Sequence, residues 1–290
     1  MRFTAAAVQI APRKGDVEAN LSQMSAAIHR CAAEGADLIV FPEASLTGYF
    51  LEGGVAEVAV TAEEIAGRLR DVVRSTPKPV DVIFGFYERG DGHIHNSAIH
   101  VTLADGRADV IHVYRKFFLP TYGVFDEERF VARGRDLTAY ETRFGKMGML
   151  ICEDVWHSIA PTIVALKGAQ IVTVISASPA RGFSGETFSN LDHYHRLLTA
   201  ISEEHAVWTI NSMLVGFEGG KGFSGGSVIV DPSGKVVAQG NELEEEIVFA
   251  EIDTDEVARV RANSPLLSDL TSVLEDISRE ISDVNEQLQR

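Results

Sequence analysis

Short apolar and β-branched runs alternate along the chain with segments of helical period, and this alternation predicts an α/β domain. No Ser- and Pro-rich stretch or change in composition marks an internal boundary. The expected strands cover residues 3–10, 37–41, 80–87, 98–103, 110–114, 148–152, 171–176 and 207–211. A last pair, residues 227–230 and 236–238, flanks the turn sequence DPSGK and predicts a hairpin.

Four helices are expected between these strands. The first covers residues 16–33, where apolar positions recur at spacings of three and four. The second begins at Thr61, because the Thr61 hydroxyl and the Glu64 carboxylate can form a reciprocal capping box. Residues 160–167 and 186–204 are the other two.

The C-terminal segment, residues 263–290, differs from the main domain of residues 1–262. Its apolar residues form one narrow seam between acidic and polar positions, which predicts a docking helix. Two partners stay open, the helix's own domain and a second subunit, and we expect a homodimer or a higher homo-oligomer. The seam consists of Leu266, Leu270, Val273, Ile277, Ile281, Val284 and Leu288.

Charge and composition exclude several classes of protein. The 290 residues include 26 Lys and Arg against 42 Asp and Glu, for a net charge of −16, which repels nucleic acid and anionic lipid. We therefore expect neither as a partner. No apolar window reaches the length of roughly 18 residues that a membrane span needs, and Gln9 and Pro12 interrupt the first apolar run, so a secretory leader fits poorly. Two cysteines, Cys31 and Cys152, suit a reducing compartment, and we expect the cytoplasm.

Cys152 is the first candidate for chemistry. It follows the apolar strand GKMGMLI and precedes a polar set and a probable helix. The carboxyl end of a strand, close to a helix N-terminus, is where an α/β sheet displays reactive groups. A small buried hydrophobic residue is the alternative. Because a free thiol has a pKa of roughly 8.5, a nucleophilic Cys152 needs a base nearby.

Two further strings carry charged residues at strand ends. FPEASLTGY places Glu43 directly after a buried strand and a proline. VYRKFFLPTYGVFDEERF places Lys116 between Arg115 and an aromatic pair. Each residue alone also fits an ordinary exposed charge.

Taken together and in this order, the three strings resemble the nitrilase, or carbon–nitrogen hydrolase, superfamily. The resemblance covers nearly the whole chain, from AAVQIAP through GMLICEDVW to FSGGSVIVDPSGKV. It implies an α-β-β-α sandwich of two mixed sheets with outer helices, and catalysis without a metal or an organic cofactor. It assigns the catalytic residues to Glu43, Lys116 and Cys152. The family's second glutamate best matches Glu127, although the neighbouring Glu128 stays open.

The resemblance also implies a role for each residue. Glu43 accepts the Cys152 proton and returns it to the departing amine. Lys116 and the backbone N–H of Glu153 donate hydrogen bonds to the oxyanion. Beside two carboxylates the Lys116 ammonium stays charged. Glu127 holds the substrate amino group or Lys116, and water then hydrolyses the thioester.

The residue after Cys152 narrows the subfamily. Glu153 stands where many relatives have an aromatic residue, and with YGVFDEERF this resembles the glutamine-hydrolysing domain of glutamine-dependent NAD synthetases. No SGG-x-D pyrophosphatase loop is present, so we expect a free-standing amidase that acts on a small linear carboxamide, without ammonia tunnelling. The candidate substrate-binding residues are Glu153, Tyr49, Tyr122, Ser178 and Arg181, of which Arg181 can pair with a substrate carboxylate.

Other interpretations stay open. A nitrilase or an N-carbamoyl hydrolase would use the same three residues, and an inactive scaffold would keep the fold alone. GFSGG fits a serine-hydrolase pattern around Ser224, but a β-run follows it and no histidine occurs after His205. HIHNSAIH and DHYHR offer imidazoles to a metal, yet neither string has a second ligand cluster fixed to it, and we expect no metal site.

Overall fold

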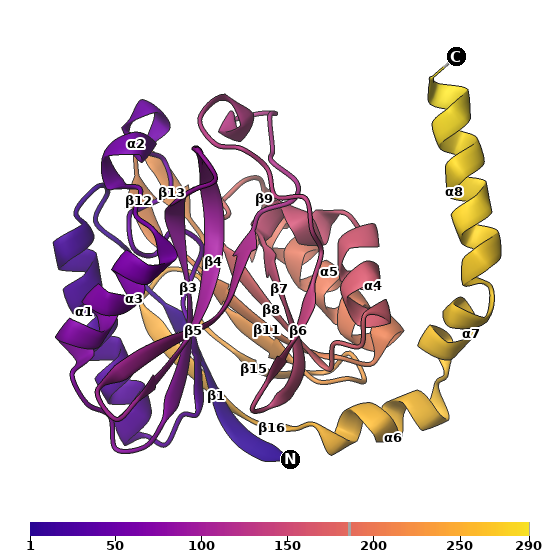
Figure 1. The fold of residues 1–290 in the computed structure, drawn as a ribbon, viewed down its shortest axis with the longest axis horizontal. Coiled ribbons are helices and arrows are strands. Elements are labelled where there is room, and N and C mark those ends of the chain that lie inside the picture. Colours follow the sequence, from indigo (N-terminus) through magenta and orange to yellow (C-terminus); the bar gives the residue numbers. More distant parts are fainter. Residues whose placement is uncertain (185–186, 290) are drawn as a thin grey trace.

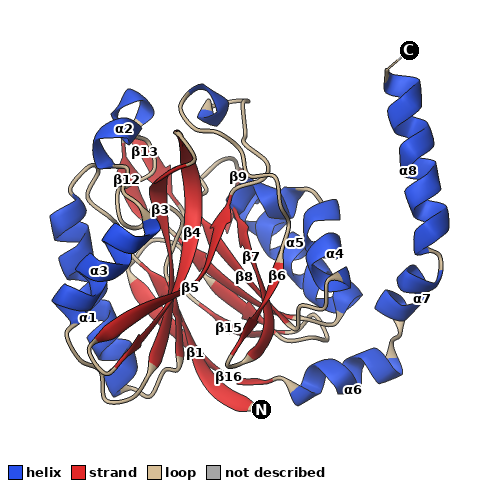
Figure 2. Ribbon diagram, in the orientation of Figure 1, coloured by secondary structure: helices blue, strands red, loops and turns tan. Residues whose placement is uncertain are grey.

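Two six-stranded mixed sheets lie face to face between outer helices (Figures 1 and 2). The structure is a computed structural model and describes residues 1–184 and 187–289. The α-β-β-α sandwich expected from the sequence is confirmed. The first sheet has the order β16 (Glu246–Asp253), β1 (Arg2–Gln9), β2 (Leu38–Val40), β3 (Val80–Gly90), β4 (His93–Ala104) and β5 (Arg107–Arg115). The second has the order β15 (Val236–Gln239), β14 (Val228–Val230), β11 (Trp208–Met213), β8 (Ile171–Ser176), β7 (Gly145–Ile151) and β6 (Ala139–Thr142).

Helices α1 (Val17–Ala33) and α3 (Ala62–Val73) cover the outer face of the first sheet, and α4 (Ile159–Leu166) and α5 (Ser189–His205) cover that of the second (Figure 1). No helix of the described residues is both long and apolar enough to cross a bilayer. Smaller elements border the sandwich: the turns η1 (Glu52–Gly54), η2 (Glu127–Arg129) and η3 (Cys152–Trp156), the helix α2 (Val55–Val58), and the two-stranded ribbons β9 (Phe183–Ser184) with β10 (Thr187–Phe188) and β12 (Gly216–Glu218) with β13 (Lys221–Phe223).

Strand β1 shows how the layers form. Successive side chains of a strand point to opposite faces. Ala5 and Ala7 therefore pack in the core between the sheets, whereas Ala6 and Val8 pack in the core that the first sheet shares with α1 and α3. All four side chains are apolar and fully buried, so the middle of β1 packs on both faces.

The expected start of the second helix is confirmed at Thr61. Its hydroxyl accepts a hydrogen bond from the Glu64 N–H at 3.2 Å, and the Glu64 carboxylate accepts one from the Thr61 N–H at 2.8 Å. This reciprocal pair satisfies two N–H groups that the first turn would leave without partners.

Several elements differ from the expectation. Strand β4 begins at His93 rather than at residue 98. Its first half is mostly polar and was therefore not expected as a strand, but it continues the hydrogen-bonded ladder with β3 as far as Gly90. Strands β6 and β16 were not expected, although β16 pairs with β1 along its whole length. The expected helix start at residue 186 lies outside the described residues, and α5 begins at Ser189.

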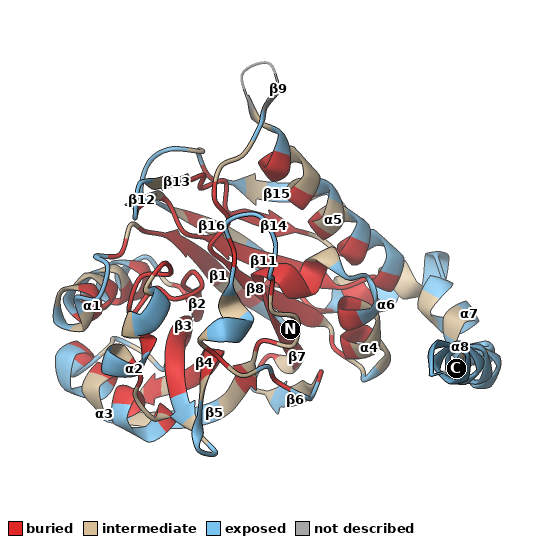
Figure 3. Cartoon of the chain, turned by 90° about the horizontal axis from the view of Figure 1, so that it is seen from above, coloured by how far each residue is buried: buried red, intermediate tan, exposed pale blue. Residues whose placement is uncertain are grey.

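The C-terminal seam is not one helix. Helix α6 (Asp255–Asn263) leads into α7 (Leu266–Ser272) and α8 (Leu274–Leu288), and Val273, with φ −117°, breaks the helix between them. Helix α7 contacts α4 and α5. Helix α8 stands away from the sandwich (Figures 1 and 3), and its apolar residues Ile281 and Val284 are 55% and 54% exposed. The docking role of this segment and its division from residues 1–262 stay predictions.

We predict that α8 packs against a second copy of the chain, because an isolated helix of about 15 residues is only marginally stable in water and the apolar seam of α8, which has 15 residues, is exposed. Ending the chain after Ser264 is expected to lower the number of subunits per particle, which is the mass from sedimentation divided by the mass of the shortened chain. Ile281→Asp, which keeps α7 in place, is expected to do the same without changing thermal unfolding of the subunit. An unaltered number of subunits for both variants contradicts the prediction.

Candidate active site

Lys116 is a buried ammonium held between two carboxylates. Its Nζ donates to Glu43 Oε1 at 2.8 Å and to Glu127 Oε1 at 2.6 Å. The residue follows the last position of β5, and its backbone is fixed on both sides: its N–H donates to the Asn96 carbonyl at 2.9 Å, and its carbonyl accepts from the Gly134 N–H at 2.7 Å. A buried charge is stable only when it is paired and hydrogen-bonded, and Lys116 meets both conditions.

Glu43 is fully buried, and its carboxylate has two hydrogen-bond partners in addition to Lys116. Oε1 accepts a hydrogen bond from the Asn96 amide at 2.8 Å, and Oε2 accepts one from the Ala177 N–H at 2.8 Å. Asn96 lies on β4 of the first sheet and Ala177 directly follows β8 of the second. The carboxylate is therefore fixed where the two sheets meet.

A glycine allows this placement. Gly85 of β3 lies directly under the Glu43 backbone, and a Cβ built on it would lie 2.3 Å from the Ala44 nitrogen and 2.7 Å from the Glu43 Cα. Its N–H also donates to the Pro42 carbonyl, and its carbonyl accepts from the Leu46 N–H, both at 3.2 Å. Any side chain at this position would displace the loop that carries Glu43.

Cys152 directly follows β7 and opens the turn η3 with φ +45°, a left-handed conformation that is strained for a residue other than glycine. Asp154 holds the turn: it accepts hydrogen bonds from the Ile151 N–H and the Phe118 N–H, both at 2.9 Å, and from the Tyr114 hydroxyl at 2.8 Å. Strained residues of this kind persist where the surrounding structure fixes them.

Tyr194 links Cys152 to the Glu43 side of the site. Its hydroxyl lies 3.1 Å from the Cys152 carbonyl and 2.6 Å from the Ser176 hydroxyl. Ser176 is the last residue of β8, and the next residue, Ala177, bonds Glu43. The structure thus brings Glu43, Lys116 and Cys152 together from three strand ends.

Burial raises the pKa of the Cys152 thiol well above its usual value. The negative charge of Glu43 raises it further, whereas the Lys116 ammonium lowers it. The resting side chain is therefore a thiol rather than a thiolate. Attack on a substrate requires a base at the moment of reaction, and Glu43 is the neighbouring carboxylate that can supply it.

Burial alone would lower the pKa of Lys116, but the charges of Glu127 and Glu43 outweigh burial and raise it. Lys116 thus remains an ammonium and cannot serve as the base. For Glu127, burial raises the pKa and Lys116 lowers it, with a net increase.

Glu127, and not Glu128, lies at this site. The Tyr49 hydroxyl donates to the same Glu127 oxygen that Lys116 contacts, and the Tyr87 hydroxyl donates to the Tyr49 carbonyl at 2.8 Å. The second oxygen, Oε2, is buried and has no partner among the described residues. Glu128 is exposed.

Three of the candidate substrate-binding residues, Tyr49, Tyr122 and Glu153, lie close enough to Cys152 to interact with it electrostatically. The Glu153 carboxylate accepts hydrogen bonds from the Tyr122 hydroxyl at 3.0 and 3.1 Å, and burial together with Glu153 raises the pKa of Tyr122 to about 12. The Arg181 guanidinium lies 5.4 Å from the centre of the Phe125 ring, and its charge also acts on Tyr122.

Ser178 contacts the segment that carries Arg181. Its hydroxyl accepts a hydrogen bond from the Asn190 amide at 3.2 Å, and Asn190 in turn accepts one from the Arg181 N–H at 2.7 Å. Ser178 therefore helps to position this segment, and its role in substrate binding stays a prediction.

Sequence reasoning missed Asn96, Gly85 and Tyr87. A glycine within a buried strand run such as VIFGFY signals close backbone approach and could have indicated Gly85. Asn96 lies in the string HIHNSAIH, which drew attention only for its histidines.

The alternative sites find no support in the described residues. Ser224 is fully buried between β13 and β14, and the element that follows it is the strand β14 rather than a helix. His95 and His100 bond the Ala132 carbonyl and the Tyr140 hydroxyl. No group of three potential metal-ligating residues occurs in the part of the chain that the structure describes.

Residues 4–262 match the sequence model of the carbon–nitrogen hydrolase family. The chain therefore belongs to that family. The architecture agrees with a carbon–nitrogen hydrolase from Helicobacter pylori G27, which is 25% identical and superposes with a TM-score of 0.79 over 93% of this chain and 95% of that one.

Two kinds of relative are about equally similar. A glutamine-dependent NAD(+) synthetase from Thermotoga maritima is 32% identical over 266 residues, which are 91% of this chain but 44% of the synthetase. The chain thus spans less than half the length of that relative. An (R)-stereoselective amidase from a Pseudomonas species is 32% identical over 291 residues, covering 97% of this chain and 96% of the amidase.

We predict that Gly85→Ala moves the Glu43 carboxylate. The added methyl group meets backbone atoms, so unfolding should become easier by about 1–3 kcal/mol. A displacement of about 1 Å can cost roughly a hundredfold in rate. Ammonia release and thermal unfolding measure the two effects. Gly53→Ala is the matched control, because a Cβ there meets nothing within 4 Å. Equal activity of the two variants contradicts the prediction.

Proposed function

We propose that the protein is a cysteine-dependent amidase that hydrolyses a small linear carboxamide to a carboxylate and ammonia. The observation that carries this proposal is the Lys116 ammonium bonded to both Glu43 and Glu127 beside the Cys152 thiol. The arrangement supplies a nucleophile, a base and a fixed positive charge without a metal or an organic cofactor.

In the first half of the reaction, Glu43 takes the thiol proton as the Cys152 sulfur attacks the carbonyl carbon of the amide. The carbonyl electron pair moves to the oxygen, and Lys116 and the backbone N–H of Glu153 stabilise the resulting oxyanion. When the carbonyl re-forms, the C–N bond breaks, and the amine leaves as ammonia with the proton that Glu43 returns. A thioester on Cys152 remains.

In the second half, Glu43 takes a proton from water, and the oxygen attacks the thioester carbon. The C–S bond breaks, the carboxylic acid leaves, and the thiol recovers its proton from Glu43. One carboxylate thus acts as base and acid in both halves. Glu127 holds Lys116 in place through Oε1. Its other oxygen, Oε2, accepts no hydrogen bond from the described residues.

Opposite charges beside the thiol suit an amide that carries both an amino and a carboxylate group. Glu153 offers a carboxylate to the ammonium of such a substrate, and Arg181 offers a guanidinium to its carboxylate. Glutamine has this form, and the similarity to a glutamine-dependent NAD(+) synthetase supports it as the first substrate to test. A nitrilase or an N-carbamoyl hydrolase is the alternative, since the same residues serve both reactions.

The cytoplasm is the location that we propose. Both cysteines are free and buried, and a nucleophilic thiol has to stay reduced.

The test is ammonia release from carboxamides, nitriles and carbamoyl compounds, with glutamine first. Cys152→Ala is expected to abolish release from the best substrate without altering the fold, because the nucleophile is lost. Cys31→Ala is the control: Cys31 is buried in α1, and burial raises its pKa to about 12, so it takes no part. Release by Cys152→Ala above roughly a few percent of the native rate, more than non-covalent binding alone leaves, contradicts the assignment, as does release from nitriles alone.

Lys116→Ala is expected to reduce kcat by about 10²–10³-fold, the usual cost of an oxyanion donor. It also leaves two buried carboxylates without their cation, which should cost about 3–5 kcal/mol of stability. Steady-state kinetics and denaturant unfolding measure both effects. A change confined to KM would remove Lys116 from the oxyanion role.

A further inference from the structure

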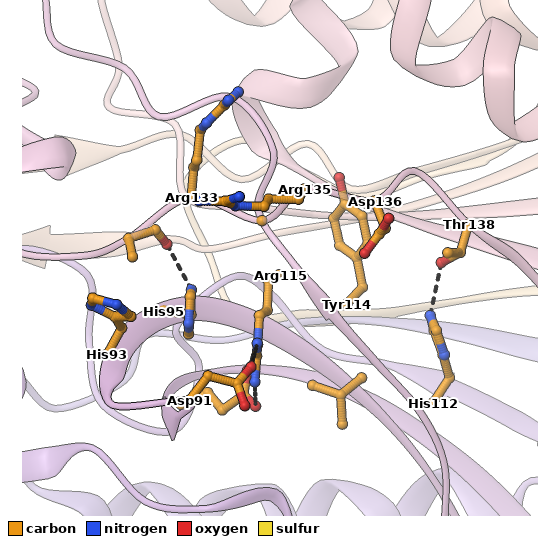
Figure 4. A pocket seen from close by; sticks show the side chains of 14 residues that line it. Asp91, His93, His95, His112, Tyr114, Arg115, Arg133, Arg135, Asp136 and Thr138 are labelled. Carbon is orange, nitrogen blue, oxygen red and sulfur yellow. Dashed lines mark hydrogen bonds and ion pairs between the residues drawn. The ribbon is translucent and has the colours of Figure 1, made fainter.

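A cavity of about 670 Å³ lies between strands β4 and β5 and residues 132–138, which cross over them (Figure 4). This volume falls within the usual range of small-molecule sites, about 300–1,000 Å³. Glu43, Lys116, Glu127 and Cys152 are not among its lining residues. The cavity is therefore separate from the catalytic residues proposed above.

Arg115 pairs with two carboxylates in the lining of the cavity, Glu88 and Asp91, and balances the charge of one of them. Its Nε and Nη2 each lie 2.8 Å from Glu88 oxygens, and its Nη1 donates to Asp91. Partial burial alone would raise the pKa of Glu88, but hydrogen bonds from Arg115 and Ser97 hold it below the usual value. Both acids are thus ionised and already paired.

Two further arginines on the crossing segment are not paired in this way. Arg133 lies with its guanidinium 5.7 Å from the centre of the Phe117 ring, and neither Arg133 nor Arg135 forms an ion pair within residues 1–184 and 187–289. Asp136 is the remaining carboxylate in the lining. The formal charges of the lining balance, with three arginines against three carboxylates, but Arg133 and Arg135 are the two cations of the lining that form no ion pair within the described residues and can still donate to an anion.

His95, in the wall of the cavity opposite these arginines, has an unused nitrogen (Figure 4). The side chain is 95% buried, since its residue is only 5% exposed. Its Nδ1 lies 2.8 Å from the Ala132 carbonyl, which only accepts hydrogen bonds, so Nδ1 carries the hydrogen. In the neutral ring Nε2 is then an acceptor, and it has no partner among the described residues. Buried polar atoms in native proteins rarely lack a partner, so a donor from a ligand would complete the site.

We propose that this cavity binds a small organic anion that carries a hydroxyl group. A phosphate or carboxylate group of the ligand lies against Arg133 and Arg135, and the hydroxyl donates to His95 Nε2. Arginine is suited to either oxyanion, because its planar fork of donors matches both.

The cavity shares its walls with the backbone that positions Lys116. His95 precedes Asn96, which bonds both Glu43 and Lys116, and the Gly134 N–H donates to the Lys116 carbonyl at 2.7 Å. A Cβ on Gly134 would lie 2.1 Å from the Arg115 carbonyl oxygen, so the crossing segment and β5 are in direct contact. Occupancy is expected to change turnover. That effect rests on the proposed amidase activity, whereas binding does not.

The test is calorimetric titration of the full chain with inorganic phosphate, ribose 5-phosphate and malate at millimolar concentration. A hydroxylated anion is expected to bind more tightly than inorganic phosphate. Ribose 5-phosphate alone would identify a phosphate ligand, and malate alone a carboxylate ligand. Because calorimetry needs no activity, a failure of binding is distinguishable from a failure of the amidase assay.

Variants with a reversed charge test whether the anion binds in this cavity. Arg135→Glu is expected to weaken binding by about tenfold or more, since it replaces a charge-assisted donor with a like charge. Arg107→Glu is the matched control, because Arg107 is also exposed and lies at the start of β5 but does not line the cavity. His95→Phe is expected to remove the preference for ribose 5-phosphate over inorganic phosphate.

Two results overturn the proposal. One is the absence of binding for all three probes. The other is that Arg135→Glu and Arg107→Glu weaken anion binding equally, which would mean that only the net charge of the protein matters.

Discussion

The burial of one ammonium between two carboxylates constrains the rest of this molecule. Glu43 lies 73 positions from Lys116 and Glu127 lies 11 positions from it. None of the three is stable in its place without the others, because an unpaired buried charge is strongly unfavourable. Asn96 and Tyr49 add hydrogen bonds to the two carboxylates. The cluster is polar, although it lies where apolar cores meet. Its geometry is fixed by the number of its hydrogen bonds and ion pairs rather than by packing alone.

The sandwich architecture explains why such a cluster can form. Glu43 lies beyond an inner strand of the first sheet, and the N–H that bonds its second oxygen lies beyond an inner strand of the second. Side chains from both sheets therefore converge at one end of the shared core, and any shift of one sheet against the other separates them. The packing between the sheets and the geometry of the candidate site therefore depend on each other, because the same interface supports both.

The sequence predicts local and buried features well and contacts between distant segments poorly. Strand β8 begins and ends where the apolar run does, at residues 171 and 176, because it is buried along its whole length. The start of β4 was missed because His93, His95 and Asn96 interrupt the apolar pattern, and those side chains are the ones that contact the cavity and Glu43. Residues in recognisable strings, such as Glu43 and Lys116, could be proposed in advance. Asn96 could not, because its role depends on a partner 53 positions away.

The protonated state of the Cys152 thiol affects more than the timing of attack. Peroxides and disulfides react with thiolates, and a thiol whose burial and acidic neighbour keep its proton in place offers them little to react with. In the proposed mechanism, this sulfur becomes reactive only when a bound carbonyl accepts its electrons. A protein built in this way is expected to withstand oxidative conditions that inactivate enzymes with a permanently ionised cysteine, and a bound substrate, rather than the surrounding redox state, determines when its sulfur is exposed to chemistry.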